Sequence, residues 1–278
     1  MSTIFTKPMS LLEIAVIKLA PVWVTCVLII GLAHPASSQA TPGFEKAMHV
    51  YKKDTLPYRI LYPVNFDRTK DYPVVLFLHG AGERGDDNEK QLVHGSKLFL
   101  QPGNRAQYPA IVVFPQCPKD DAWTRRAVKK VDGKRQFSFK KGGKPSPAMG
   151  VLVHLVDSLY QLPFVDQGRV YLGGLSMGGM GTFELAWRRP GMFAAAFPIC
   201  GGGNPKNARQ YAEKIPFWIF HGAKDDVVPP EYSEQMVAAI QAHGGQVKFS
   251  LYPEANHNSW DKAFAEPDLM PWLFSKSK

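Results

Sequence analysis

Three side chains of this sequence have the types and the order that a serine nucleophile needs. Ser176 lies in Gly174-Leu175-Ser176-Met177-Gly178, which fits G-x-S-x-G, the pattern of a sharp turn between a strand and a helix. A serine hydroxyl is a weak nucleophile at neutral pH, so it needs a base that takes its proton and an acid that orients the base. An acid and then a histidine follow Ser176, each just after a predicted strand. This order predicts acyl-transfer chemistry.

The acid and the base must be chosen from a few candidates. Asp225 and Asp226 are adjacent in one loop, and only one of them can face the base because neighbouring side chains of an extended segment point apart. The residue pattern alone favours neither aspartate. Of the two histidines beyond them, His243 lies where a helix should end, a position typical of structural histidines. His257 lies in a loop after a strand and is the predicted base.

Acyl transfer also needs hydrogen-bond donors for the oxyanion that forms on the substrate. The amide of Met177, directly after the nucleophile, is one expected donor, and the amide of Ala81 is the other. Ala81 lies in a glycine-rich loop, residues 80–85, that also fits the dinucleotide-binding pattern G-x-G-x-x-G. That alternative requires an acid at the end of the next strand, where the sequence has Val113-Phe114-Pro115-Gln116. It also leaves the serine, the acid and the histidine without a role.

Alternating strands and helices position these residues. The alternation predicts a mostly parallel sheet with helices on both faces. Residues 47–52 and 56–62 are expected to form an antiparallel hairpin at one edge, and the uniformly apolar residues 74–78 a central strand. Helices are expected at residues 88–100 and 259–274.

The first forty residues have the features of an export signal. Lys7 and Lys18 precede an apolar run at residues 19–32, and Ser38 and Ala40 offer the small side chains of a cleavage site. The alternative is an uncleaved anchor, although the apolar run is short for a membrane span. We therefore expect residues 1–40 to be removed, and residues 41–278 to form a single catalytic domain in the periplasm or outside the cell.

Composition excludes several other functions. The formal charge is +9, but no stacking-aromatic or recognition-helix pattern accompanies it, so we expect no nucleic-acid partner. No cluster of cysteine and histidine has metal-ligand spacing, so we expect neither a metal nor a cofactor. Cys117 and Cys200 follow different predicted strands and are expected to be separate buried thiols.

These motifs together resemble the α/β-hydrolase superfamily over about residues 47–274. The stretches at residues 77–85, 115–118, 174–179 and 257–260 are similar to a group of secreted bacterial esterases, described as phospholipase/carboxylesterase-like or predicted peptidases. That group is similar to feruloyl esterases and polyhydroxybutyrate depolymerases. The resemblance implies an eight-stranded sheet with Asp225 as the acid, His257 as the base, and Ala81 and Met177 as the oxyanion hole.

The resemblance further implies a secreted serine esterase without a stable membrane anchor. Its substrates would be feruloyl, acetyl or short-chain acyl esters, either small molecules or esters linked to polysaccharide. The alternatives are a serine peptidase of the same fold and a non-enzymatic polysaccharide-binding protein. The oligomeric state is not predicted.

One segment departs from the pattern of the group, a basic insertion at about residues 119–144. The basic run is expected either to attract acidic substrates or to form a solvated loop. Trp123 in this insertion and Trp260 after the predicted base are candidate substrate-binding residues.

Overall fold

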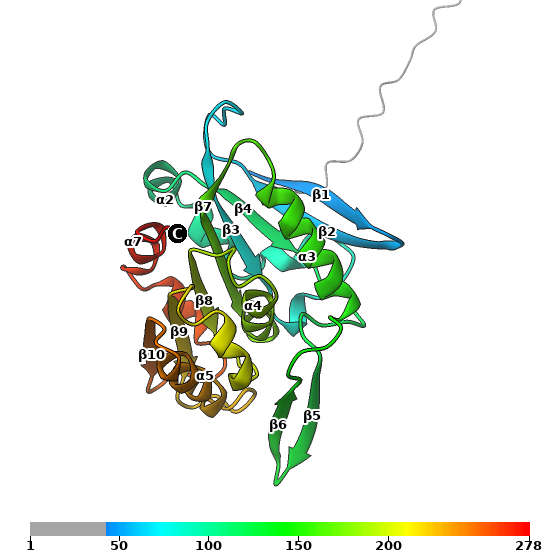
Figure 1. Ribbon diagram of the computed structural model, residues 1–278, viewed down its shortest axis with the longest axis vertical. Helices are drawn as coiled ribbons and strands as arrows, with labels where there is room; N and C mark the ends of the chain where they lie inside the picture. Colours follow the sequence, from blue (N-terminus) through cyan, green and yellow to red (C-terminus); the bar gives the residue numbers. More distant parts are fainter. Residues whose placement is uncertain (1–42) are drawn as a thin grey trace, which may run out of the picture. The chain divides into compact units, whose positions relative to one another are not determined.

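The computed structural model describes residues 43–278, so the predicted signal at residues 1–40 lies outside the described part of the chain. Its centre is an eight-stranded sheet with the strand order β1-β2-β4-β3-β7-β8-β9-β10 (Figure 1). The strands are β1 Phe44–Tyr51, β2 Asp54–Leu61, β3 Tyr72–Leu78, β4 Ile111–Pro115, β7 Val165–Leu175, β8 Ala195–Ile199, β9 Phe217–Gly222 and β10 Val247–Tyr252.

Strand pairing brings the predicted catalytic loops to one edge of this sheet. Strand β2 is antiparallel to both β1 and β4, and the pairs from β4 to β10 are parallel. This confirms the predicted sheet with its antiparallel edge hairpin. Leu78, the last residue of β3, pairs with Gly174 near the end of β7. The glycine-rich loop after β3 therefore begins beside the turn that carries Ser176.

Helices cover both faces of the sheet, as predicted. On one face α3 (Pro147–Tyr160), α4 (Met177–Arg188) and α5 (Glu231–Ala242) contribute to one hydrophobic core. On the other face α1 (Ser96–Leu100), α6 (Trp260–Phe264) and α7 (Leu269–Phe274) contribute to a second core, and the short α2 (Pro102–Gln107) follows α1. Both faces of a central strand are buried, because alternate β3 side chains enter opposite cores.

Two helix predictions were wrong, and each has a local cause. Residues 88–100 form a single 3₁₀ turn at Lys90–Leu92 and then α1, because Gly95 between them adopts a φ of +83°. A side chain at Gly95 would also press on Phe77 and Phe264. Residues 259–274 are divided into α6 and α7, with Pro267 in the connection, where it has no amide hydrogen to continue a helix.

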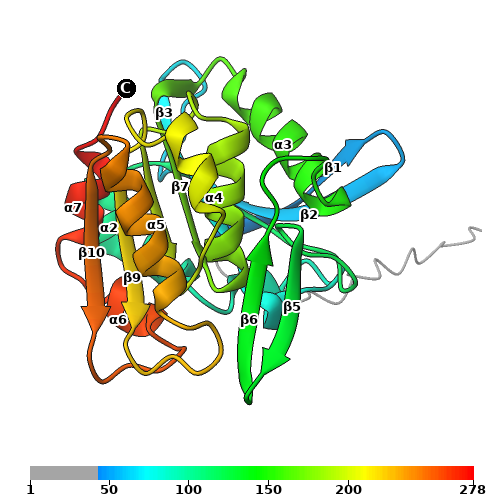
Figure 2. The same ribbon diagram turned by 60° about the horizontal axis from the view of Figure 1, so that its bottom comes forward.

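The basic insertion forms a two-stranded hairpin of β5 (Arg126–Val131) and β6 (Lys134–Phe139). It projects from the body of the domain at the end where β9 and β10 finish (Figure 2). Its turn is Asp132-Gly133, both with positive φ, as a two-residue hairpin turn requires. Within residues 43–278, no helix has the length and apolar character needed to cross a membrane.

Candidate active site

Ser176 occupies the strained turn between β7 and α4. Its φ of 53° is unusual for a residue with a side chain, and its amide donates a hydrogen bond to the carbonyl of Ile199 over 2.9 Å. Gly178 permits the turn, because a Cβ at this position would overlap the carbonyl of Leu78 at the end of β3. The turn thus brings the start of α4 against the strand that precedes the glycine-rich loop.

The structure brings the three predicted side chains into one hydrogen-bonded chain. The Nδ1 atom of His257 lies 2.7 Å from Oδ2 of Asp225, and its Nε2 atom lies 2.9 Å from Oγ of Ser176. An ionised carboxylate can only accept, so Nδ1 carries the imidazole proton and Nε2 is free to accept the proton of Ser176. This tautomer is the one in which the imidazole can act as a base toward the serine.

The structure also separates the two adjacent aspartates. Asp225 is buried and faces His257, whereas Asp226 is exposed. Amides of Val227 and Val228 each donate to Oδ1 of Asp225 over 2.9 Å. Burial alone would raise the pKa of Asp225, but hydrogen bonds from His221 and His257 and from the Val228 amide hold this pKa well below its usual range. The carboxylate therefore stays charged opposite the imidazole.

The two predicted oxyanion donors border the same cavity as Ser176. Ala81 and Met177 both line this cavity, which has a volume of about 300 Å³. Met177 is the first residue of α4, where backbone amides have no partner within the helix. A Cβ built on Gly80 would lie 3.7 Å from the Cβ of Ser176, so the glycine-rich loop passes directly beside the serine. The two amides thus belong to segments that flank the nucleophile.

Sequence reasoning missed three buried polar side chains near the site, which lie beside the glycine-rich loop or beside Asp225. Gln116, fully buried after β4, donates from Nε2 to the carbonyl of Glu83 over 3.2 Å and to Asp87 over 2.9 Å. His79 is also buried, at the end of β3. His221 lies behind the acid, with Nε2 3.2 Å from Oδ2 of Asp225. A polar residue at the end of a uniformly apolar strand was the available signal for all three.

The two candidate substrate-binding tryptophans have different positions. Trp260 lines the cavity, with its ring 5.4 Å from that of His257 in an edge-to-face arrangement. Trp123 does not, and the suggestion that it forms a substrate wall is wrong. Its side chain is fully buried, and its indole nitrogen donates to the carbonyl of His79 over 3.1 Å. A large aromatic ring with a satisfied polar atom is a core residue here.

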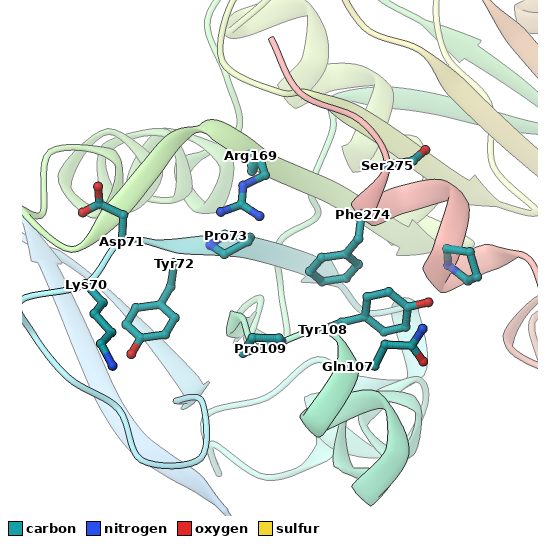
Figure 3. A pocket seen from close by; sticks show the side chains of 11 residues that line it. Lys70, Asp71, Tyr72, Pro73, Gln107, Tyr108, Pro109, Arg169, Phe274 and Ser275 are labelled. Atoms are coloured by element: carbon teal, nitrogen blue, oxygen red, sulfur yellow. The ribbon is translucent and has the colours of Figure 1, made fainter.

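The remaining cavity wall comes from segments far apart in the sequence. The hairpin contributes Arg126, Arg135 and Phe137 to the lining, and His94 and Glu83 are further polar residues in it. A larger hollow of about 530 Å³ lies where β3, β4 and β7 begin, bordered by Tyr72, Pro109, Arg169 and Phe274 among others (Figure 3). It is at the opposite end of these strands from Ser176, so it contains none of the predicted catalytic groups.

Among the described residues, one group of side chains has the composition of a metal site. Cys200, Asp225 and His257 have potential ligand atoms within 4.8 Å of one another. The carboxylate and the Nδ1 atom are already joined by a hydrogen bond. Burial raises the pKa of the Cys200 thiol, which keeps it protonated. Cys117 and Cys200 are both buried and unpaired, as expected.

Comparison with known proteins identifies a family to which this amino-acid sequence is similar. The model of the dienelactone hydrolase family matches residues 123–268. A thermostable esterase of known structure is similar with a TM-score of 0.75 and 31% identity, over 85% of this chain and 64% of that chain. A ferulic acid esterase is similar in fold, with a TM-score of 0.60 and 15% identity, over 83% of this chain and 98% of that chain.

A curated relative adds a second similarity over a shorter stretch. The bifunctional acetylxylan esterase/xylanase XynS20E of Neocallimastix patriciarum is 36% identical over 74 residues, which are 27% of this chain and 11% of that protein. The chain thus spans less than two thirds of both the fungal enzyme and the thermostable esterase. These similarities confirm the resemblance to the α/β-hydrolase superfamily and to esterases within it.

Proposed function

The chain belongs to the dienelactone hydrolase family, and from this premise we propose that it is an exported serine hydrolase of carboxylic esters. The observation that supports this most strongly is the hydrogen-bonded chain from Ser176 through His257 to Asp225. It opens into a cavity that the two expected oxyanion donors also border. A nucleophile, a base, an acid and oxyanion donors at one site are the groups that acyl transfer needs.

In the proposed mechanism, Oγ of Ser176 attacks the ester carbonyl while Nε2 of His257 takes its proton. The amides of Ala81 and Met177 stabilise the negative charge on the carbonyl oxygen. His257 returns the proton to the leaving alcohol, and a water molecule activated by the same imidazole then hydrolyses the acyl-enzyme. Asp225 keeps Nδ1 protonated and stabilises the imidazolium that forms in each step.

The proposed substrates are feruloyl, acetyl or short-chain acyl esters, free or linked to polysaccharide. The names of the related esterases support this range. A cavity of about 300 Å³ with Trp260 and Phe137 in its lining can hold a small acyl group or one aromatic ring. Cleavage of the predicted signal after Ala40 would release the enzyme, and N-terminal sequencing of exported protein tests that step.

A burst experiment tests the central proposal. Wild type and Ser176→Ala are mixed with p-nitrophenyl acetate, butyrate and octanoate, and methyl ferulate is assayed alongside them. We expect a burst of p-nitrophenol equal to the enzyme concentration in wild type and none in the variant. The burst arises because p-nitrophenol leaves in the first step, while the acyl group stays on Ser176 until water removes it. A variant that keeps near-wild-type turnover would refute the mechanism.

The peptidase alternative requires a different comparison. An ester and an amide that carry the same acyl group are assayed in parallel on wild type. We expect the ester to be cleaved far faster than an unactivated amide. An amide cleaved as fast as its ester would instead favour a peptidase. If wild type is folded and cleaves neither compound, a binding function on the same scaffold gains support.

A further inference from the structure

The hairpin adds a charged wall to the proposed ester-binding cavity. We infer that Arg126 and Arg135 form a subsite for a carboxylate, so that the preferred ester carries an anionic group beside the scissile bond. This inference rests on the proposed function, because it concerns the substrate of the same site. Both side chains line the cavity that contains Ser176 and His257.

The register of the hairpin explains which of its basic residues face the cavity. Arg126 pairs with Phe139, and Lys130 pairs with Arg135. Paired residues share one face of an antiparallel ladder, and alternate residues of each strand share a face as well. Arg126, Arg135 and Phe137 therefore lie on one face, and all three line the cavity. Lys129, which pairs with Gln136, lies on the opposite face and is exposed.

The guanidinium group of Arg126 has hydrogen-bonding capacity that the described residues leave unused. Its Nε atom is buried and has no partner within the described residues. Ion pairs of arginine with carboxylates in residues 43–278 involve other side chains, namely Arg59, Arg169, Arg188 and Arg189. A guanidinium group that has no carboxylate of the described residues beside it can offer its donors to an anionic ligand in the cavity that this side chain lines.

The charges around the wall favour an anion. Burial and the nearby charge of Arg84 lower the pKa of Arg126, which nevertheless remains a cation because guanidinium groups are very strongly basic. The carboxylate in the lining belongs to Glu83, whose Oε1 atom lies 3.8 Å from Nε2 of His94, on the part of the wall that the glycine-rich loop supplies. Among the side chains that line the cavity, the guanidinium groups of Arg126 and Arg135 therefore outnumber the carboxylate of Glu83.

The hairpin is attached firmly enough to present these arginines. The backbone amide of Phe137 donates to the Tyr232 hydroxyl over 2.7 Å, and their rings meet edge to face at 5.5 Å. The Asn204 side chain donates to the carbonyl of Phe139 over 2.8 Å. These contacts join β6 to the loop after β8 and to α5. The subsite is thus held against the main domain that carries Ser176.

Matched ester pairs test the subsite. In the first pair the carboxylate is on the alcohol part of the ester, and 4-acetoxybenzoate is compared with the neutral 4-acetoxybenzamide. In the second pair the carboxylate is on the acyl part, and monomethyl terephthalate is compared with the neutral methyl 4-carbamoylbenzoate. The proteins are wild type, Arg126→Gln, Arg126→Lys, Arg135→Gln and the control Lys129→Gln. The readout is the ratio of KM for the anionic ester to KM for its neutral partner.

We expect Arg126→Gln to raise this ratio about tenfold for at least one pair, because it removes a charge-assisted hydrogen bond. Arg135→Gln should raise the ratio of KM values less, because the Arg135 side chain is exposed. Arg126→Lys keeps the positive charge, so it should raise the ratio less than Arg126→Gln does. Lys129→Gln should leave both esters unchanged. Added salt should raise KM for the anionic ester only. Equal changes for the anionic and neutral esters, or an equal effect of Lys129→Gln, would overturn the inference.

A binding measurement separates this inference from the proposed function. Calorimetry with Ser176→Ala compares 4-acetoxybenzoate with 4-acetoxybenzamide, which that variant should not cleave, with and without Arg126→Gln. If wild type hydrolyses no ester, the proposed function fails, and a preference for the carboxylate that requires Arg126 would still support the subsite. If wild type hydrolyses neutral esters but neither KM nor binding depends on Arg126, only the subsite is refuted.

Discussion

The imidazole of His79 accepts a hydrogen bond from the backbone amide of Cys117, over 2.9 Å to Nε2. Because Nε2 is the acceptor, Nδ1 carries the proton and donates it to the carbonyl of Gly80 over 2.6 Å. One neutral side chain therefore joins the end of β4 to the glycine-rich loop after β3. The same hydrogen bond fixes the carbonyl of Gly80, the residue before the expected oxyanion donor Ala81.

His79 should make stability depend on pH. Burial lowers its pKa to about 4, while an unfolded histidine has a pKa of about 6.5. The unfolded chain therefore binds a proton that the folded chain excludes, and the free energy of unfolding should fall by about 2 kcal/mol from pH 6.5 to pH 5. Urea denaturation of wild type and His79→Gln at both pH values measures this. The same pH dependence in the two proteins would contradict it.

Asp225 and Asp226 provide a matched pair for the role of the acid. Asp225→Asn can no longer hold the proton on Nδ1 of His257, so kcat should fall by about 10³-fold to 10⁴-fold with the fold retained. Asp226→Asn makes the same chemical change at an exposed neighbour and should leave kcat within about twofold of wild type. Steady-state kinetics with one ester measures kcat for both variants. A comparable loss of kcat in the two variants would contradict the assignment of Asp225 as the acid.

The acid limb of the pH profile should arise from one proton. A general base must be unprotonated to accept the proton of Ser176, so kcat/KM should fall at acid pH through a single protonation. The pKa of Asp225 is held below its usual range, so this carboxylate stays ionised throughout that interval. A logarithmic plot of kcat/KM against pH should therefore have a slope of one on the acid side. A slope of two would show that a second essential group takes up a proton in the same pH range.

The nucleophile turn should not tolerate a methyl group at Gly178. Gly178→Ala places a Cβ on the carbonyl of Leu78, so we expect a loss of about 3 kcal/mol in the free energy of unfolding, together with loss of ester hydrolysis. Gly103→Ala is the control, because a Cβ there meets nothing within 4 Å and the residue lies in α2. It should change stability by less than about 1 kcal/mol. Thermal or urea denaturation compares the two, and equal effects would contradict the steric argument.

The two tryptophans should respond in opposite ways. Trp123→Phe removes a hydrogen bond and volume from the core, so the free energy of unfolding should fall by about 2 kcal/mol, with little change in KM. Trp260→Ala removes part of the cavity wall and should raise KM with a smaller loss of stability. Parallel kinetics and denaturation test this pair. A raised KM in Trp123→Phe alone would restore the original suggestion.

The amino-acid sequence by itself determined the order of chemical groups and the class of fold. The turn around Ser176, the uniformly apolar β3 and the alternation of strands and helices are local patterns, because each depends on neighbours along the chain. They were sufficient to predict the sheet, its edge hairpin and the loops that meet at its carboxyl edge. They also predicted side chains that the structure brings together, although 81 residues separate Ser176 from His257.

Only the tertiary structure decided which way particular side chains face. Asp225 and Asp226 differ in burial because the loop after β9 turns the first toward His257. Trp123 enters the core beneath His79, and the hairpin turns Arg126 toward the cavity while Lys129 points away. These outcomes depend on contacts between segments distant in the sequence. Residue type and spacing along the chain do not determine which way these side chains face, because the burial of each one depends on the segments that pack against it in the fold.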